Sequence, residues 1–282
     1  MARTGRVKLD GEAYYHVIDR IAHKAFLLER PDVKGALLGC LQRAADFSGV
    51  DIGSYVLMDN HIHLCIHVPQ GSKIADGELL RRIGVLYGTV RSDTLDARWR
   101  ALEASGEEVV AEREKESYRR RMGDLSEFMK TFKQRFSQWY NATFRHEGTL
   151  WSGRFKSVMV ESGEHMRVVV NYIHGNPVRA GMAARVADYG WSALGAAHRG
   201  DPLAVRGLSL LGIDIYADVD AMKRDRRLSN GKIIGSVRFV AQMKARLGMA
   251  AAGSPRRQNS FSFCGHSMTA SHGHRSAPRH AA

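Results

Sequence analysis

Apolar and polar positions fall into blocks that predict a strand, a helix and a second strand within the first 69 residues. Residues 14–20 are a short run rich in β-forming side chains, as expected for a strand. Between residues 33 and 47 the apolar positions recur at helical spacing, and Gly49 follows them. Residues 55–69 form an almost unbroken apolar run that ends in a Pro-Gln-Gly-Ser turn, which is typical of a buried strand. This order predicts the opening of an α+β sandwich.

The middle of the chain is expected to be helical. Residues 75–90 carry apolar side chains at helical spacing, whereas residues 92–123 are dense in both charges and predict a solvated helix or insertion. Asp124 and Glu127 then resemble a capping pair at the start of another helix. One face of that helix is an apolar and aromatic stripe, which is typical of core packing: Leu125, Phe128, Met129, Phe132, Phe136, Trp139 and Tyr140.

The last third divides into a strand, a helix and weaker patterns. Residues 158–161 predict a strand, and residues 164–174 predict a helix that the Gly-Asn-Pro sequence at 175–177 should end. We expect a first domain over residues 1–195, with 92–123 as a charged insertion. Residues 196–248 predict a small helical appendage. Residues 249–282 contain no acidic residue and predict a disordered basic tail.

The candidate chemistry starts with two histidines in the run at residues 55–69. His61 and His63 are separated by one apolar residue, so on a strand both imidazoles point to the same face, about 7 Å apart. Two neutral imidazoles at that distance can bind one divalent cation. Cys65 and His67 continue the same face. The alternative is that the two histidines are ordinary polar residues on the solvent face of a sheet.

The charge balance indicates the class of partner. The chain has 42 Lys and Arg against 29 Asp and Glu, a net charge of +13, which favours a polyanion such as nucleic acid over an acidic membrane surface. The three cysteines, Cys40, Cys65 and Cys264, have no paired spacing, so we expect no disulfide framework and a reducing cytoplasm. No signal peptide and no run long enough for a membrane span is evident.

Several basic and aromatic residues are candidate contacts to nucleic acid. The loop at residues 148–157 places Trp151, Arg154 and Lys156 close together, where they could stack on bases and meet phosphates. The alternative is an ordinary turn that contains basic residues. The further candidate phosphate contacts are Lys130, Lys133 and Arg179.

A series of short motifs, taken in order, resembles the REP-associated tyrosine transposases, which belong to the single-tyrosine branch of the HUH nucleases. The resemblance covers roughly residues 7–195, and each motif alone is weak. The series consists of Tyr15-His-Val, Met58-Asp-Asn-His-Ile-His-Leu, the aromatic helix that ends at Asn141, Gly148-Thr-Leu-Trp-Ser-Gly-Arg-Phe-Lys-Ser, and Tyr172-Ile-His-Gly-Asn-Pro-Val-Arg-Ala-Gly.

The resemblance implies a fold and an activity. The fold would be an antiparallel sheet with the histidine strand central and helices on one side, in a homodimer. The activity would be cleavage and rejoining of single-stranded DNA beside a hairpin, through a 5′-phosphotyrosine and a free 3′-OH. Mg²⁺ or Mn²⁺ would be held by His61, His63 and a polar side chain from the tyrosine helix; the candidates for that side chain are Gln138 and Asn141, with Gln134 as a further option.

The sequence departs from the family pattern at the nucleophile. Phe136 occupies the position at which we expect the tyrosine, and Tyr140 lies one helical turn further on the same face, so Tyr140 is the candidate nucleophile. Two hypotheses follow: a metal-dependent DNA strand transferase, or a protein on the same fold that binds DNA hairpins without cutting them. A third hypothesis is a zinc-dependent hydrolase or RNA-binding protein that uses His61, His63 and Cys65.

Overall fold

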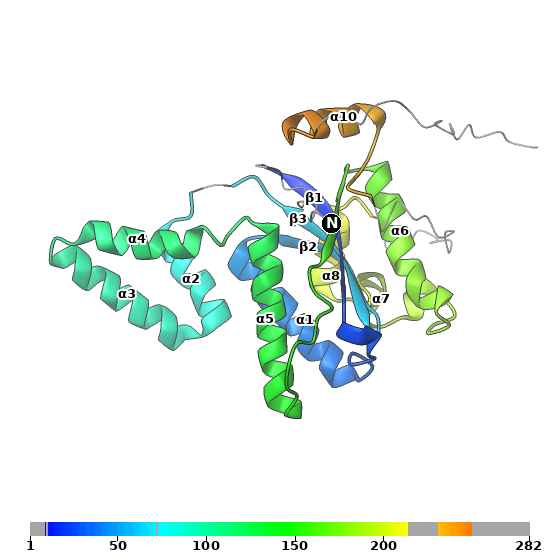
Figure 1. Ribbon diagram of the computed structural model, residues 1–282, viewed down its shortest axis with the longest axis horizontal. Coiled ribbons are helices and arrows are strands. Elements are labelled where there is room, and N and C mark those ends of the chain that lie inside the picture. Colours follow the sequence, from blue (N-terminus) through cyan, green and yellow to red (C-terminus); the bar gives the residue numbers. More distant parts are fainter. Residues whose placement is uncertain (1–8, 10, 72, 214–230, 250–282) are drawn as a thin grey trace, which may run out of the picture. The chain divides into compact units, whose positions relative to one another are not determined.

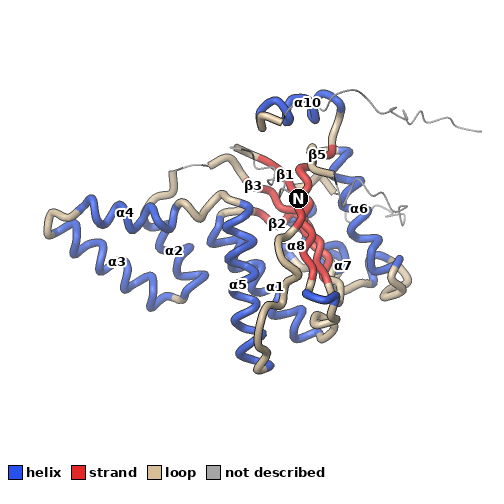
Figure 2. The backbone as a smooth tube through the Cα atoms, viewed as in Figure 1, coloured by secondary structure: helices blue, strands red, loops and turns tan. Residues whose placement is uncertain are grey.

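The computed structural model describes residues 9, 11–71, 73–213 and 231–249 (Figure 1). The predicted basic tail and Cys264 therefore lie outside the described residues, apart from residue 249. The described part contains a five-stranded sheet with the strand order β2-β3-β1-β4-β5, shown in red in Figure 2.

The sheet confirms the predicted fold class. Its strands are β1 (Ala13–Arg20), β2 (Asp51–Leu57), β3 (His61–Val68), β4 (Lys156–Val160) and β5 (Ile233–Ile234). The first four pair in antiparallel fashion, and β5 pairs parallel to β4. The histidine strand β3 is interior to the sheet, and β1 is the middle strand. The run at residues 55–69 is thus a hairpin and not one strand, because residues 58–60 form a turn closed by a bond from Met58 N–H to His61 C=O (2.9 Å).

Helices make up most of the rest of the described chain. They are α1 (Pro31–Ser48), α2 (Asp76–Tyr87), α3 (Thr89–Ala104), α4 (Glu108–Arg119), α5 (Leu125–Phe144), α6 (Glu164–Arg179), α7 (Ala193–His198), α8 (Pro202–Leu210) and α10 (Val237–Arg246). The apolar spacing over residues 232–247 predicts one amphipathic helix, but α10 begins only at Val237, because residues 233 and 234 belong to β5.

The helices cover both faces of the sheet, whereas the sequence analysis expected one. Lys133 of α5 pairs with Asp19 (2.8 Å). Asp19 lies opposite Ile62, the residue between His61 and His63, so it points to the face away from the histidines. His174 of α6 instead bonds to Ser54 (2.8 Å) on the histidine side. Figure 1 shows α1 and α5 on one side of the strands and α6 on the other. Both faces carry apolar side chains, so both require cover.

Local hydrogen bonds explain where α5 begins and why α6 continues. The Asp124 carboxylate caps α5 by accepting from the backbone N–H groups of Ser126 (2.6 Å) and Glu127 (3.0 Å). The prediction that a helix ends at residue 174 is wrong, because α6 runs on to residue 179. Pro177 has no N–H for the carbonyl of Ile173, but the Asn176 side-chain amide donates to that carbonyl instead (3.1 Å).

The charged segment at residues 92–123 has a small core of its own. Its exposed charges fit the predicted solvated surface, but Trp99 is only 2% exposed and donates a hydrogen bond to Glu114 (3.1 Å). This core combines the inward faces of α2, α3 and α4 with one residue of α1: Phe47, Leu79, Ile83, Leu86, Leu95, Trp99 and Ala111. The segment is therefore a packed helical insertion.

Later parts of the chain cover both edges of the sheet. At the β2 edge, Leu57 N–H bonds to the carbonyl of Trp191 (2.9 Å), and Gly207 of α8 packs so closely that an added Cβ would lie 2.4 Å from the Ile52 carbonyl oxygen. On the other side, β4 pairs with the two-residue strand β5, and Met159 N–H bonds to the carbonyl of Lys232 (2.9 Å). No helix among the described residues is long and apolar enough to cross a membrane.

Candidate functional site: the histidine face

One face of the sheet gathers the histidines, as the strand alternation predicts. We call it the histidine face and define it by His16, Ile18 and Arg20 of β1 with His61, His63 and Cys65 of β3. Ile18 lies opposite His63 and Arg20 opposite His61 in the antiparallel register. The His61 and His63 rings are 5.1 Å apart between centroids, which is close enough for both to reach one cation.

Both ring Nδ1 atoms of the histidine pair have hydrogen-bond partners. His61 Nδ1 lies 2.7 Å from Asn60 Oδ1, and His63 Nδ1 lies 3.0 Å from Nε2 of His16. The His16 and His63 rings also stack, with centroids 5.3 Å apart and planes 15° from parallel. Nε2 is therefore the ring nitrogen through which His61 and His63 would bind a metal ion.

The environment keeps both histidines neutral at neutral pH. Burial, and then the nearby Arg20 charge, lowers the pKa of His61 to about 4. Burial, and then the neighbouring His16 and His61, lowers the pKa of His63 well below its usual value. A neutral imidazole is the form that ligates a divalent cation.

Tyr172 is the tyrosine that the structure brings to the histidine pair. It lies on α6, and its ring meets His63 (6.2 Å, 85°) and His16 (6.3 Å, 77°) edge to face. Its side chain is buried, and the Arg179 guanidinium lies 5.0 Å from its ring centroid. The sequence analysis missed Tyr172 as a site residue, although it opens one of the quoted motifs and occupies an inward position of its helix.

Exposed cations flank the same face. Arg20 and Lys156 are both exposed. Arg20 lies opposite His61 in the sheet, and Lys156 lies opposite Ile18, which in turn lies opposite His63. Arg179 is also exposed, and its charge contributes to the lowered pKa of His63. Positive charge around a cation site favours a phosphate oxygen as the incoming ligand. Arg179 also donates hydrogen bonds to the Tyr172 carbonyl (2.7 Å) and to Asn176 Oδ1 (2.9 Å).

Tyr140, the tyrosine expected from the sequence, lies elsewhere. It is on α5, which covers the opposite face of the sheet, and its ring packs against Phe144 (4.7 Å), His146 (5.7 Å) and Phe136 (6.0 Å). Phe136 is completely buried and contacts Trp151. The structure therefore does not bring Tyr140 or Phe136 to His61 and His63, because the sheet separates them.

The amides expected as third metal ligands also lie on α5. Gln134 and Gln138 are exposed there, and Asn141 donates to the Gly148 carbonyl (3.3 Å). An amide on α6 is that of Asn176, one turn after Tyr172, whose Oδ1 accepts from Arg179 (2.9 Å). No three His, Cys, Asp or Glu residues gather as a metal group in the part of the chain that the structure describes.

The donor set therefore fits a divalent cation with two nitrogen ligands from the protein. Nε2 of His61 and Nε2 of His63 suit Mg²⁺ less well than Mn²⁺, which accepts nitrogen ligands more readily. The remaining ligand positions would go to water and phosphate oxygens. Cys65 is fully buried, and burial raises the pKa of its thiol to about 12, which disfavours the zinc hypothesis.

The remaining predicted DNA contacts divide by exposure. Trp151 is 5% exposed, packs on Phe132 and donates to Ser137 Oγ (3.1 Å), so its ring offers no open face to a base. Lys133 is committed to Asp19. Lys130 is exposed, pairs loosely with Glu127 (3.3 Å) and lies on α5, away from the histidine face; Arg154 is exposed in the loop before β4.

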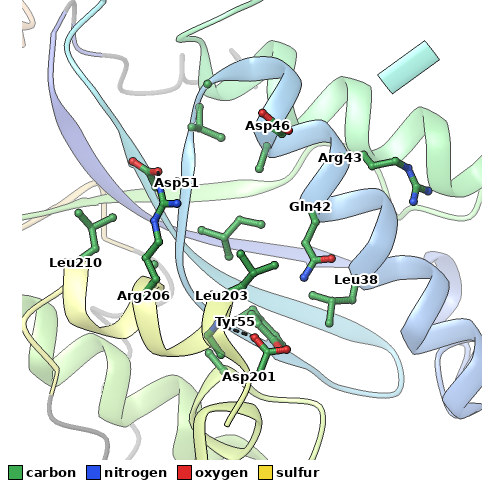
Figure 3. Close-up of a pocket in the computed structure, with 18 of the residues that line it drawn as sticks. Leu38, Gln42, Arg43, Asp46, Asp51, Tyr55, Asp201, Leu203, Arg206 and Leu210 are labelled. Carbon is green, nitrogen blue, oxygen red and sulfur yellow. Dashed lines mark hydrogen bonds and ion pairs between the residues drawn. The ribbon is translucent and has the colours of Figure 1, made fainter. Parts of the chain in front are cut away.

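A pocket of about 1080 Å³ lies between α1 and α8, over the edge strand β2 (Figure 3). Its walls combine apolar side chains such as Leu38 and Leu203 with charged ones. Figure 3 shows Arg206 reaching toward Asp51, in agreement with their separation of 3.8 Å. None of the residues that line it belongs to the histidine face, so this pocket is separate from the candidate site.

Comparisons with known proteins find similarity among solved structures. No protein-family model matches the chain, and no curated protein matches it. Among solved structures, the chain is similar to one described as "Structure of the REP associates tyrosine transposase bound to a REP hairpin". The two share 16% sequence identity with a TM-score of 0.49, over 80% of this chain and 96% of that chain. A likeness of this degree carries no argument about function.

Proposed function

We propose that this protein cleaves and rejoins single-stranded DNA beside a hairpin, with Tyr172 as the nucleophile. The observation that carries the proposal is the packing of the Tyr172 ring against His63, on the face that also holds His61 and exposed cations. The net charge of +13 supports a nucleic-acid substrate. Tyr172 replaces Tyr140 in this proposal because Tyr172 lies on the same side of the sheet as the histidines.

Each residue has a role that its position allows. Arg20, Lys156 and Arg179 would hold the scissile phosphate and its neighbours by charge. The Tyr172 phenol would attack phosphorus and lose its proton, and the bond to the 3′ oxygen would break. The products would be a 5′-phosphotyrosine and a free 3′-OH. In the reverse step a 3′-OH of another DNA end would attack the phosphotyrosine, release Tyr172 and so rejoin the strand.

A divalent cation is part of the proposal. An unassisted phenol with a pKa of about 10 is a poor nucleophile at neutral pH. Mn²⁺ or Mg²⁺ held by His61 and His63 would supply stabilisation of the negative charge that develops on the phosphate. The protein itself contributes orientation, because the buried Tyr172 ring is fixed by His16, His63 and the Arg179 guanidinium.

The test is covalent capture of a labelled oligonucleotide. The protein is incubated with Mn²⁺ and a hairpin that carries a single-stranded flank, and adducts are separated on a denaturing gel. We expect an adduct with the wild type, no adduct with Tyr172→Phe, and an undiminished adduct with the matched control Tyr140→Phe. An adduct that persists in Tyr172→Phe and disappears in Tyr140→Phe would overturn the assignment.

The second candidate function is hairpin binding without cleavage. The observation that favours it is that no group of three His, Cys, Asp or Glu residues in the described part of the chain is placed to hold a metal ion. Tight hairpin binding in a gel-shift assay, with no adduct from the wild type at any Mn²⁺ concentration, would select this function. Homodimerisation, which the family resemblance implies, is measured in the same samples by sedimentation.

A further inference from the structure

His16 is a buried histidine next to the candidate site that has no role as a metal ligand or phosphate contact in the proposed chemistry. It is fully buried on β1, and its Nε2 lies 3.0 Å from Nδ1 of His63. The planes of the two rings are 15° from parallel, and the distance between the two nitrogens is that of a hydrogen bond. A second histidine at this place needs an explanation, because an apolar residue would fill a buried strand position equally well.

The bond between the two rings contains one proton, and its position has a chemical consequence. If Nδ1 of His63 donates to Nε2 of His16, then Nε2 of His63 keeps a lone pair. If His16 donates instead, neutral His63 carries its proton on Nε2 and cannot bind a metal ion there. The direction of this single hydrogen bond therefore decides whether His63 is a ligand.

The neighbouring ligand candidate, His61, has the position of its ring proton fixed by Asn60. Asn60 donates through Nδ2 to the Lys24 carbonyl (3.4 Å), and this bond turns its Oδ1 toward His61. Oδ1 only accepts hydrogen bonds, so Nδ1 of His61 must be the donor across the 2.7 Å contact. The lone pair of His61 is then on Nε2.

We propose that His16 is a positioning residue that accepts a hydrogen bond from Nδ1 of His63 and thereby presents Nε2 of His63 to the divalent cation. The inference rests on the proposed function for the cation. The tautomer itself is a property of the metal-free protein. The Tyr172 ring contacts both imidazoles edge to face.

The experiment measures the tautomer first and metal affinity second. ¹⁵N NMR of the histidine-labelled, metal-free protein reports which ring nitrogen of His63 carries the proton, and the His63→Gln variant assigns the signals. We expect the proton on Nδ1 in the wild type and in His16→Gln, because the glutamine oxygen can accept the same bond. In His16→Leu, which offers no acceptor, the proton should no longer be held on Nδ1.

Mn²⁺ affinity, measured by electron paramagnetic resonance, should fall about 10–100-fold in His16→Leu and by much less in His16→Gln. A wild-type His63 with its proton on Nε2 overturns the proposal. This result needs no variant, so the proposal can be tested even if His16→Leu fails to fold. Equal Mn²⁺ affinity in the wild type and His16→Leu overturns it as well. The expected tautomers without Mn²⁺ binding in the wild type would support the positioning role and refute the proposed metal site.

Discussion

His174 allows a sharp test of the packing between α6 and the sheet. Its ring is 1% exposed, its Nε2 lies 2.8 Å from Ser54 Oγ, and its Nδ1 has no hydrogen-bond partner among the described residues. Burial lowers the pKa of His174 to about 3. The folded protein therefore resists protonation at this residue, whereas the unfolded chain takes up the proton near pH 6.5.

The sign and size of the effect follow from this difference. Well above pH 6.5 neither state binds the proton, so protonation of His174 does not change the free energy of unfolding. Below pH 6.5 the unfolded state is stabilised by binding the proton, so the free energy of unfolding falls as the pH falls toward the folded pKa. At pH 4.5 the loss from this one residue is about 2.5 kcal/mol relative to pH 7.5. Replacing it with leucine removes that loss, at a cost of about 1 kcal/mol for the hydrogen bond to Ser54.

The order of stability should therefore invert with pH. In urea unfolding followed by tryptophan fluorescence, His174→Leu should be the less stable protein at pH 7.5 and the more stable one at pH 4.5, by about 1.5 kcal/mol. Other buried histidines titrate equally in both proteins, so the difference isolates His174. The exposed His198, changed to glutamine, is the control. Parallel stability curves for His174→Leu and the wild type would refute the reasoning.

Two backbone features give further predictions. Asn176→Ala removes the amide that bonds the Ile173 carbonyl beside Pro177 and should cost about 1 kcal/mol of unfolding free energy in urea; no loss would mean that water replaces the amide. Gly207→Ala places a Cβ 2.4 Å from the Ile52 carbonyl oxygen and should lower stability by about 1–3 kcal/mol. Gly35→Ala, in an open position of α1, should instead raise it by about 0.5–1 kcal/mol, and equal effects of the two alanines would contradict the packing at Gly207.

The sequence was sufficient for features that depend on short-range periodicity. The alternation of a strand placed His61 and His63 on one face, and the spacing of apolar residues located α1 and α5 closely. The N-cap at Asp124 was visible for the same reason, since a cap acts only on the next three residues.

Long-range arrangement decided the part that the sequence analysis missed. An amphipathic pattern shows that a helix has an apolar face, but it does not show which side of a sheet that face covers. Tyr140 and Tyr172 both lie on inward helix positions, and only the packing of α5 on one face and α6 on the other separates them. Likewise, His16 gains its meaning from the neighbouring strand, because the pairing of β1 with β3 puts it beside His63.

The covered edges of the sheet restrict how two copies of this chain can associate. An open edge strand is a template on which another β-strand can add, and it is a common route both to continuous-sheet dimers and to aggregation. Here the β2 backbone is already bonded to Trp191 and approached by Gly207, and β4 is followed by the two-residue strand β5. In the described part of the chain the sheet therefore ends at a covered β2 and at a β5 of only two residues, which leaves little backbone on which a further strand could pair.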